Sequence, residues 1–146
     1  MNATELVRYG LDNVGHHLSM TFEGIDERGM DARVAPVGKT AREIVAHLCE
    51  CYRAALDVCR TGKHEWGSFR IEETSWPKLI SLWTQMREEA VAECLAGDEG
   101  RLKVAVDYVM LHDEYHVGQM CLIRLQADPN WDSDSIYHSP AQEGLS

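Results

Sequence analysis

The hydrophobic positions of the chain recur at intervals of three and four residues in four segments, and this is the period of an amphipathic α-helix. The four segments span about 4–24, 40–62, 75–97 and 98–128. Two of them open with capping signals, because "NATE" and "TARE" each place a Glu three residues after a side chain that can accept a backbone hydrogen bond. The pattern therefore predicts four helices.

The connections between these segments differ in length, and this bears on the topology. The stretches 25–39 and 62–74 lack a helical period and are predicted to be loops, although "FRIEET" at 69–74 is compatible with a short strand. The turn at 97–98 is tight, so the third and fourth helices should be antiparallel neighbours. We therefore predict an all-α fold, a four-helix bundle in which the long loops permit crossover connections.

The composition is that of a soluble globular protein with one domain. The chain has 146 residues, of which 45% are hydrophobic and 26% charged, and no apolar run approaches the roughly 20 residues of a membrane helix. We treat 1–146 as a single domain whose last part, from about 130 to 146, is a polar tail. The N-terminal residues lack the basic and apolar regions of a signal peptide, so a cytoplasmic location is expected.

The net charge indicates which partners to expect, and the cysteine content indicates the state of the thiols. The formal net charge of -10 disfavours binding to nucleic acid and to anionic membrane surfaces. The five cysteines are odd in number and follow no secretory signal, so reduced thiols are expected. Most of them should serve as small buried hydrophobic side chains.

The last helical segment carries two histidines within its apolar stripe. The stripe consists of Leu102, Ala105, Val109, His112, His116, Met120 and Ile123. Buried imidazoles need polar partners, which could be neighbouring side chains or backbone groups. A single metal ion would satisfy both rings at once, because residues four apart on a helix have Cβ atoms roughly 5–6 Å apart. The pattern alone leaves both interpretations open.

A metal site needs a further ligand, and His47 is the best placed of the remaining histidines. It lies three residues after Ile44, at the border of the stripe of the second helix. Helix bundles commonly build metal sites from side chains on facing helices. Three histidines leave one coordination position open, which is typical of catalytic sites. Cys51, one turn from His47, is a candidate fourth ligand or nucleophile, although a packed core thiol is the commoner role.

Two segments together resemble the signature segments of the DinB/YfiT-like superfamily. They are "TAREIVAHLCE" at 40–50 and "HDEYHVGQM" at 112–120. That family has a first histidine in the second helix of a bundle and His-x-x-x-His in its last long helix, commonly followed by the Gly-Gln pair found here at 118–119. The resemblance covers most of the chain. A basic residue often precedes the Gly in that family, whereas this chain has Val117, so that basic contact is missing.

The resemblance implies a four-helix bundle with a divalent ion on His47, His112 and His116, and often a homodimer. Zn or Ni is the expected metal, since imidazole suits several transition ions. Members of the superfamily include transferases and isomerases that use low-molecular-weight thiols. We therefore expect a metal-dependent enzyme with a small-molecule substrate, either a thiol-dependent transferase or a metal-assisted hydrolase. The alternative is a non-catalytic metal- or ligand-binding module with a structural ion.

The same residues allow other interpretations. "HDEYH" is similar to the zincin motif with Asp113 as the base, but Asp is one methylene shorter than Glu and no downstream ligand follows. Tyr108 and Gln119 lie one turn from the paired histidines, where they could contact a substrate or a ligand, or simply border the solvent. Metal binding should weaken in mild acid, because free imidazoles protonate near pH ~6.5.

Overall fold

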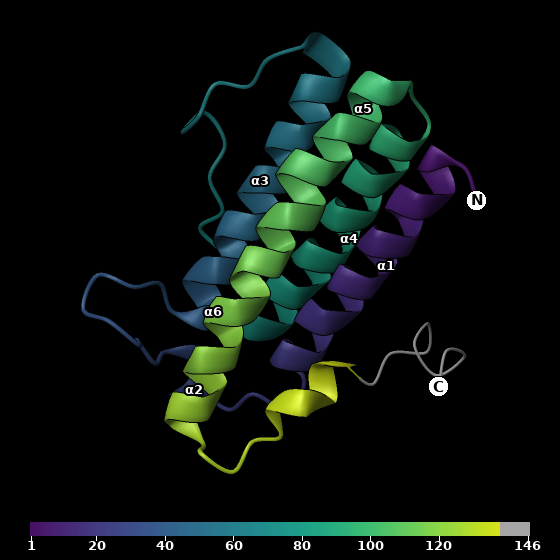
Figure 1. Ribbon diagram of the computed structural model, residues 1–146. Helices are drawn as coiled ribbons and strands as arrows, with labels where there is room; N and C mark the ends of the chain where they lie inside the picture. Colours follow the sequence, from purple (N-terminus) through teal and green to yellow (C-terminus); the bar gives the residue numbers. More distant parts are fainter. Residues whose placement is uncertain (138–146) are drawn as a thin grey trace.

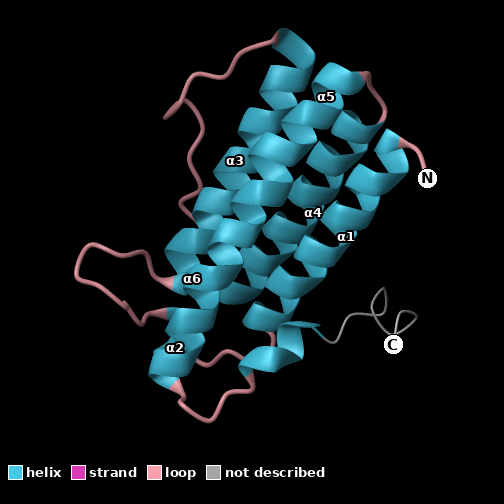
Figure 2. Cartoon of the chain, in the orientation of Figure 1, coloured by secondary structure: helices cyan, strands magenta, loops and turns pink. Residues whose placement is uncertain are grey.

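Four long helical rods lie side by side in the computed structural model, which describes residues 1–137 (Figures 1 and 2). Three of them are α1 (Ala3–Phe22), α3 (Ala41–Thr61) and α4 (Trp76–Leu95). The last rod is continuous and consists of α5 (Glu99–Val104), the π-helical segment η1 (Ala105–Met110) and α6 (Leu111–Ala127). The described part of the chain contains no strand, so the prediction of an all-α bundle is confirmed.

The second and third long helices run parallel, because the loop that joins them returns along the bundle (Figure 1). At one end Arg60 of α3 pairs with Glu93 of α4 at 3.5 Å. At the other end Arg42 of α3 donates a hydrogen bond to the carbonyl of Thr74, just before α4 begins. By contrast, only a tight turn separates α4 from α5, and these two pack against each other as predicted.

The loop between α1 and α3 contains a helix that the pattern did not predict. This single turn, α2 (Glu27–Met30), is capped by Asp26, whose carboxylate accepts the Gly29 N–H at 2.9 Å. It is too short to show a hydrophobic period, which explains the miss. Residues 69–74 form no strand, so that suggestion is wrong. The Ile71 N–H donates instead to a carboxylate oxygen of Glu50 on α3.

Local sequence accounts for most of the helix ends. Both predicted capping boxes are present, at Asn2 and at Thr40. Gly62 ends α3 with φ of 80°, a left-handed conformation that suits glycine. Ser75 precedes α4 but makes no side-chain cap, and the Glu73 carboxylate accepts the Ser75 N–H at 2.9 Å.

The predicted stripe of the last rod is buried except at His112. Leu102 lies before the π-helical segment, Ala105 and Val109 lie within it, and all three are buried as the stripe predicts. Downstream, Asp113 is fully buried, whereas His112 is only half-buried. A π turn adds a residue to the helical repeat and rotates the following side chains relative to a regular helix. His112 therefore lies at the border of the core and not within it.

The C-terminal segment adds one short element to the bundle. The 3₁₀-helix η2 (Ser133–Tyr137) places the buried Ile136 against the core and packs on α1. The rest of the predicted polar tail, 138–146 with His138, lies outside the described residues. Among residues 1–137, no helix combines the length and the apolar character that crossing a membrane requires.

Candidate metal centre

Three imidazoles from two helices lie next to one another between α3 and the last rod. His47 comes from α3, and His112 and His116 come from successive turns of α6. The Nε2 atom of His112 lies 3.2 Å from that of His47 and 3.1 Å from that of His116. The ring centroids are 4.6 to 5.2 Å apart in all three pairs. The structure thus brings together the three residues singled out in the sequence.

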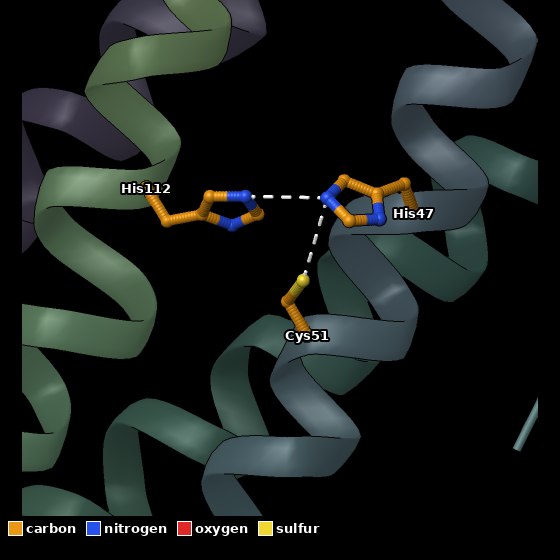
Figure 3. A group of neighbouring side chains, drawn as sticks. All are labelled: His47, Cys51 and His112. Atoms are coloured by element: carbon orange, nitrogen blue, oxygen red, sulfur yellow. Dashed lines mark hydrogen bonds between the residues drawn. The ribbon is translucent and has the colours of Figure 1, made fainter. Parts of the chain in front are cut away.

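A thiol borders the same cluster. The Cys51 Sγ atom lies 3.7 Å from the His47 Nε2 atom, one turn along α3 (Figure 3). One ligand atom each from His47, Cys51 and His112 falls within 4.8 Å of the others, so these three form a possible metal-binding group. His116 joins the cluster through its contact with His112.

The spacing of the donor atoms fits a small divalent ion. Zinc binds imidazole nitrogen at 2.0–2.1 Å and thiolate sulfur at about 2.3 Å, so the edges of a tetrahedral site are about 3.3 Å for two nitrogens and about 3.6 Å for nitrogen and sulfur. The observed separations of 3.2 and 3.1 Å between nitrogens and 3.7 Å to sulfur are close to these edges. Nitrogen and sulfur donors are also those that transition ions prefer.

Burial keeps the three histidines in the neutral form that can bind a metal. It lowers the pKa of His112 and of His116 to about 4, with neighbouring histidines adding to the effect. The pKa of His47 is also lowered, mainly by burial and then by the positive charge of Lys39. Burial raises the pKa of the Cys51 thiol to about 12, so without an ion this sulfur stays protonated.

His116 has a partner on its other ring nitrogen. The Nδ1 atom of His116 lies 2.6 Å from the Oε1 atom of Gln119, which is one turn further along α6. The amide nitrogen of Gln119 donates in turn to the Tyr115 hydroxyl at 3.2 Å. Of the two roles considered for Gln119 in the sequence, the structure therefore supports contact with a candidate ligand.

The cluster opens into a cavity of about 250 Å³. His47, Cys51 and His112 form one wall, and the other lining residues are Trp66, Asp107 and Tyr108. Asp107 and Tyr108 belong to the π-helical segment, while Trp66 lies in the loop after α3 and is 61% exposed. No periodic pattern marks Trp66 as a site residue, because a loop residue reaches this wall only through the return of the chain along the bundle.

Asp113 faces away from this cluster and into the bundle. Its Oδ1 atom accepts the Tyr52 hydroxyl at 2.7 Å, and its Oδ2 atom accepts the Arg87 Nε–H at 2.9 Å. Trp83 donates to the Tyr52 oxygen at 2.9 Å, which completes the network. Since both carboxylate oxygens bind these side chains, Asp113 does not serve as the base of a zincin site.

The other described histidines lie apart from the centre. His64 pairs with Asp57 at 2.7 Å, and His17 pairs with Glu114 at 3.4 Å.

Comparison of the chain with known protein families, with curated proteins and with solved structures finds no match in any of the three.

Proposed function

We propose that this protein is a metal-dependent enzyme of the DinB/YfiT-like type, which binds one divalent ion through His47, His112 and His116. The observation that carries the proposal is the clustering of the three imidazoles, whose ring centroids lie 4.6 to 5.2 Å apart, beside a cavity that His47 and His112 line. Three protein ligands leave a coordination position for a small molecule. A homodimer belongs to the same proposal and is supported by the sequence resemblance alone.

The proposed reaction is a thiol transfer. An ion held by these histidines would lower the pKa of a thiol bound beside it and so supply a thiolate at neutral pH, with the proton passing to solvent. That sulfur would form a bond to an electrophilic carbon, while the bond to the leaving group breaks and the leaving group takes the electron pair. Hydrolysis, with water in place of the thiol, is the related alternative.

Some residues of this chain would bind the ion, and others would line the cavity. The imidazoles of α3 and α6 provide the ion's ligands. Trp66 and Tyr108 supply aromatic walls against which an apolar part of a substrate can pack. The Asp107 carboxylate, also in the wall, makes the cavity less favourable for anionic substrates.

A specific observation supports a second candidate function. Cys51 lies 3.7 Å from His47, close enough to act as a fourth ligand. Four protein ligands would close the coordination sphere, which is typical of structural metal sites. The protein would then be a metal-binding module without turnover.

Metal binding is tested by elemental analysis of the purified protein and by titration of the metal-free chain with Zn²⁺ and Ni²⁺. We expect one ion per chain for the wild type, and a loss of affinity of at least about 100-fold in His47→Ala, because a direct ligand is removed. His17→Ala is the matched control, since it removes an imidazole that pairs with Glu114 outside the cluster. Full stoichiometry and affinity in His47→Ala would refute the three-histidine site.

Catalysis is tested separately with the fully metallated protein. A panel of low-molecular-weight thiols is combined with electrophilic substrates, and product formation is followed in wild type and in His47→Ala. We expect turnover that requires both the thiol and the ion. Stoichiometric metal binding without turnover across the panel would instead favour the binding-module function.

A further inference from the structure

We infer that Gln119 is a positioning residue that fixes the protonation of His116, so that its Nε2 atom is presented to the ion. The inference rests on the proposed metal site and assigns the residue that orients one ligand. Its basis is a chain of two hydrogen bonds, from His116 to Gln119 and from Gln119 to Tyr115.

The two ends of the Gln119 side chain have different partners, and the end that faces His116 determines which ring nitrogen carries the proton. The Oε1 atom faces the His116 Nδ1 atom at 2.6 Å, and a carbonyl oxygen can only accept a hydrogen bond. Nδ1 must therefore carry the hydrogen, which leaves the lone pair of the neutral ring on Nε2. That Nε2 atom is the one 3.1 Å from His112.

Tyr115 is the partner of the other end of the amide. The Gln119 Nε2–H group donates to the Tyr115 hydroxyl at 3.2 Å. If the amide were reversed, its NH₂ group would face His116 Nδ1, and the ring would have to carry its proton on Nε2, where it could not bind an ion. The orientation of one amide thus decides whether His116 is a competent ligand.

The two other candidate ligands have no side chain that binds their second ring nitrogen within the described part of the chain. Within residues 1–137, neither His47 nor His112 has a hydrogen-bond partner for its Nδ1 atom. His116 is also the most buried of the three rings, at 2% exposure. We infer that His116 is the anchoring ligand, whose ring is held in place before the ion arrives.

A purely structural role for Gln119 does not fit its position. Its partners, Tyr115 and His116, lie four and three residues earlier on the same helix, so the bonds connect no two elements of the bundle. Gln119 is only half-buried. Its loss should consequently change metal binding while leaving the stability of the bundle nearly unchanged.

The test compares three variants of the full chain. Gln119→Met has a similar shape but no acceptor for Nδ1–H, Gln119→Glu restores an acceptor, and Gln85→Met is the matched control on the exposed face of α4. Long-range ¹H–¹⁵N NMR spectra of the metal-free proteins report which ring nitrogen of His116 is protonated. Zn²⁺ affinity is measured by competition with a chromophoric chelator.

We expect the wild type to carry the His116 proton on Nδ1 and Gln119→Met to shift it toward Nε2. Zn²⁺ affinity should fall about 10- to 100-fold in Gln119→Met, and return in Gln119→Glu to the wild-type value or above, as is usual for partners of metal-binding histidines. Unfolding midpoints of Gln119→Met and Gln85→Met should agree, which separates positioning from folding.

Two results would overturn the inference while leaving the proposed function intact. One is an Nε2-protonated His116 in the wild type that nevertheless binds Zn²⁺, and the other is an unchanged affinity in Gln119→Met. If the wild type binds no Zn²⁺ at all, the proposed function fails first, and the positioning role fails with it. The NMR result on metal-free protein distinguishes these cases.

Discussion

Cys51 is the residue that decides whether the candidate centre is open or closed. Its sulfur lies within reach of the site, yet burial raises the pKa of its thiol to about 12. Deprotonating a buried thiol needs a stronger charge-stabilising interaction than binding a neutral imidazole, which already has a free lone pair. We therefore expect the ion to be held by the histidines, with Cys51 as a protonated lining residue of the cavity.

Co²⁺ replacement tests this expectation at the level of single ligands. The Co²⁺-loaded wild type should show no sulfur-to-metal charge-transfer band, and Cys51→Ala should bind Co²⁺ with affinity within a few-fold of the wild type. A band should appear when an exogenous thiol is added. If instead the wild type shows the band and Cys51→Ala abolishes it, the site is closed by a fourth ligand and the structural function is favoured.

At the scale of elements, the buried network around Asp113 ties α6 to the rest of the bundle. Arg87 of α4 donates to Asp113 of α6 at 2.9 Å and to the Leu11 carbonyl of α1 at 2.7 Å. Tyr52 of α3 binds the other Asp113 oxygen. Since Asp113 follows His112 directly, this network fixes the position of the candidate ligands relative to α3.

Replacing Arg87 tests the contribution of the network. Arg87→Met should lower the free energy of unfolding by about 3 kcal/mol at pH 7, because it leaves Asp113 buried without its charge partner. Arg53→Met is the matched control, since Arg53 pairs with Asp57 on the exposed surface and such pairs contribute about 0.5 kcal/mol or less. Both are measured by urea denaturation. Equal effects in the two variants would show that the buried pair contributes no more to the free energy of unfolding than the exposed pair does.

The long helices follow from sequence because each carries its own periodic stripe and its own caps. The features that were missed depend on tertiary contacts. Gly10 and Gly15 weaken α1 as an isolated helix, but they leave room for the side chains of Met110 and Arg87. The π-helical segment has no local signature, and directly after it Asp113 is buried while His112 lies at the border of the core.

The candidate site could likewise be predicted only in part from the sequence. His47, His112 and His116 could be found from helical spacing, because two rings on one helix and one ring on a facing stripe need little further information. The amide orientation of Gln119 and the approach of Trp66 depend on side-chain and loop geometry that spacing does not contain. Residues that orient or surround a candidate site are thus harder to predict than the clustered histidines themselves.

At the scale of the whole molecule, the centre couples protonation to folding. Burial lowers the pKa of His112 and His116 to about 4, whereas imidazoles in the unfolded chain titrate near pH ~6.5. Between these values the unfolded chain binds protons that the folded protein does not. The free energy of unfolding of the metal-free protein should therefore fall as pH decreases from about 6.5 to about 4, and these two groups should contribute no further change below that.

Protonation of Asp113 changes the free energy of unfolding in the opposite direction. The contribution of the histidines must therefore be measured as the difference from a variant that lacks them. Burial raises the pKa of Asp113 to about 6 although Arg87 and Tyr52 oppose the shift, and a raised carboxyl pKa favours the folded state as pH falls. The variant with His112→Leu and His116→Leu retains Asp113. Leu fits the helix stripe, so we expect this variant to fold, to bind no ion, and to lack the histidine-dependent loss of stability in acid.

Metal binding should weaken at a lower pH than the pKa of free imidazoles suggests. Because the folded metal-free protein already holds His112 and His116 neutral, protons compete with the ion at these two rings only as pH approaches their depressed pKa values near 4. The stabilisation by Zn²⁺, measured as the difference between loaded and metal-free wild type in thermal unfolding, should be constant from pH 7 to about 5 and decline below about 5. A decline centred near pH ~6.5 would show that the rings titrate as if exposed, and so contradict their burial in the folded protein. A difference that persists undiminished at pH 4, or that is equally present in the double Leu variant, would place the ion on other ligands.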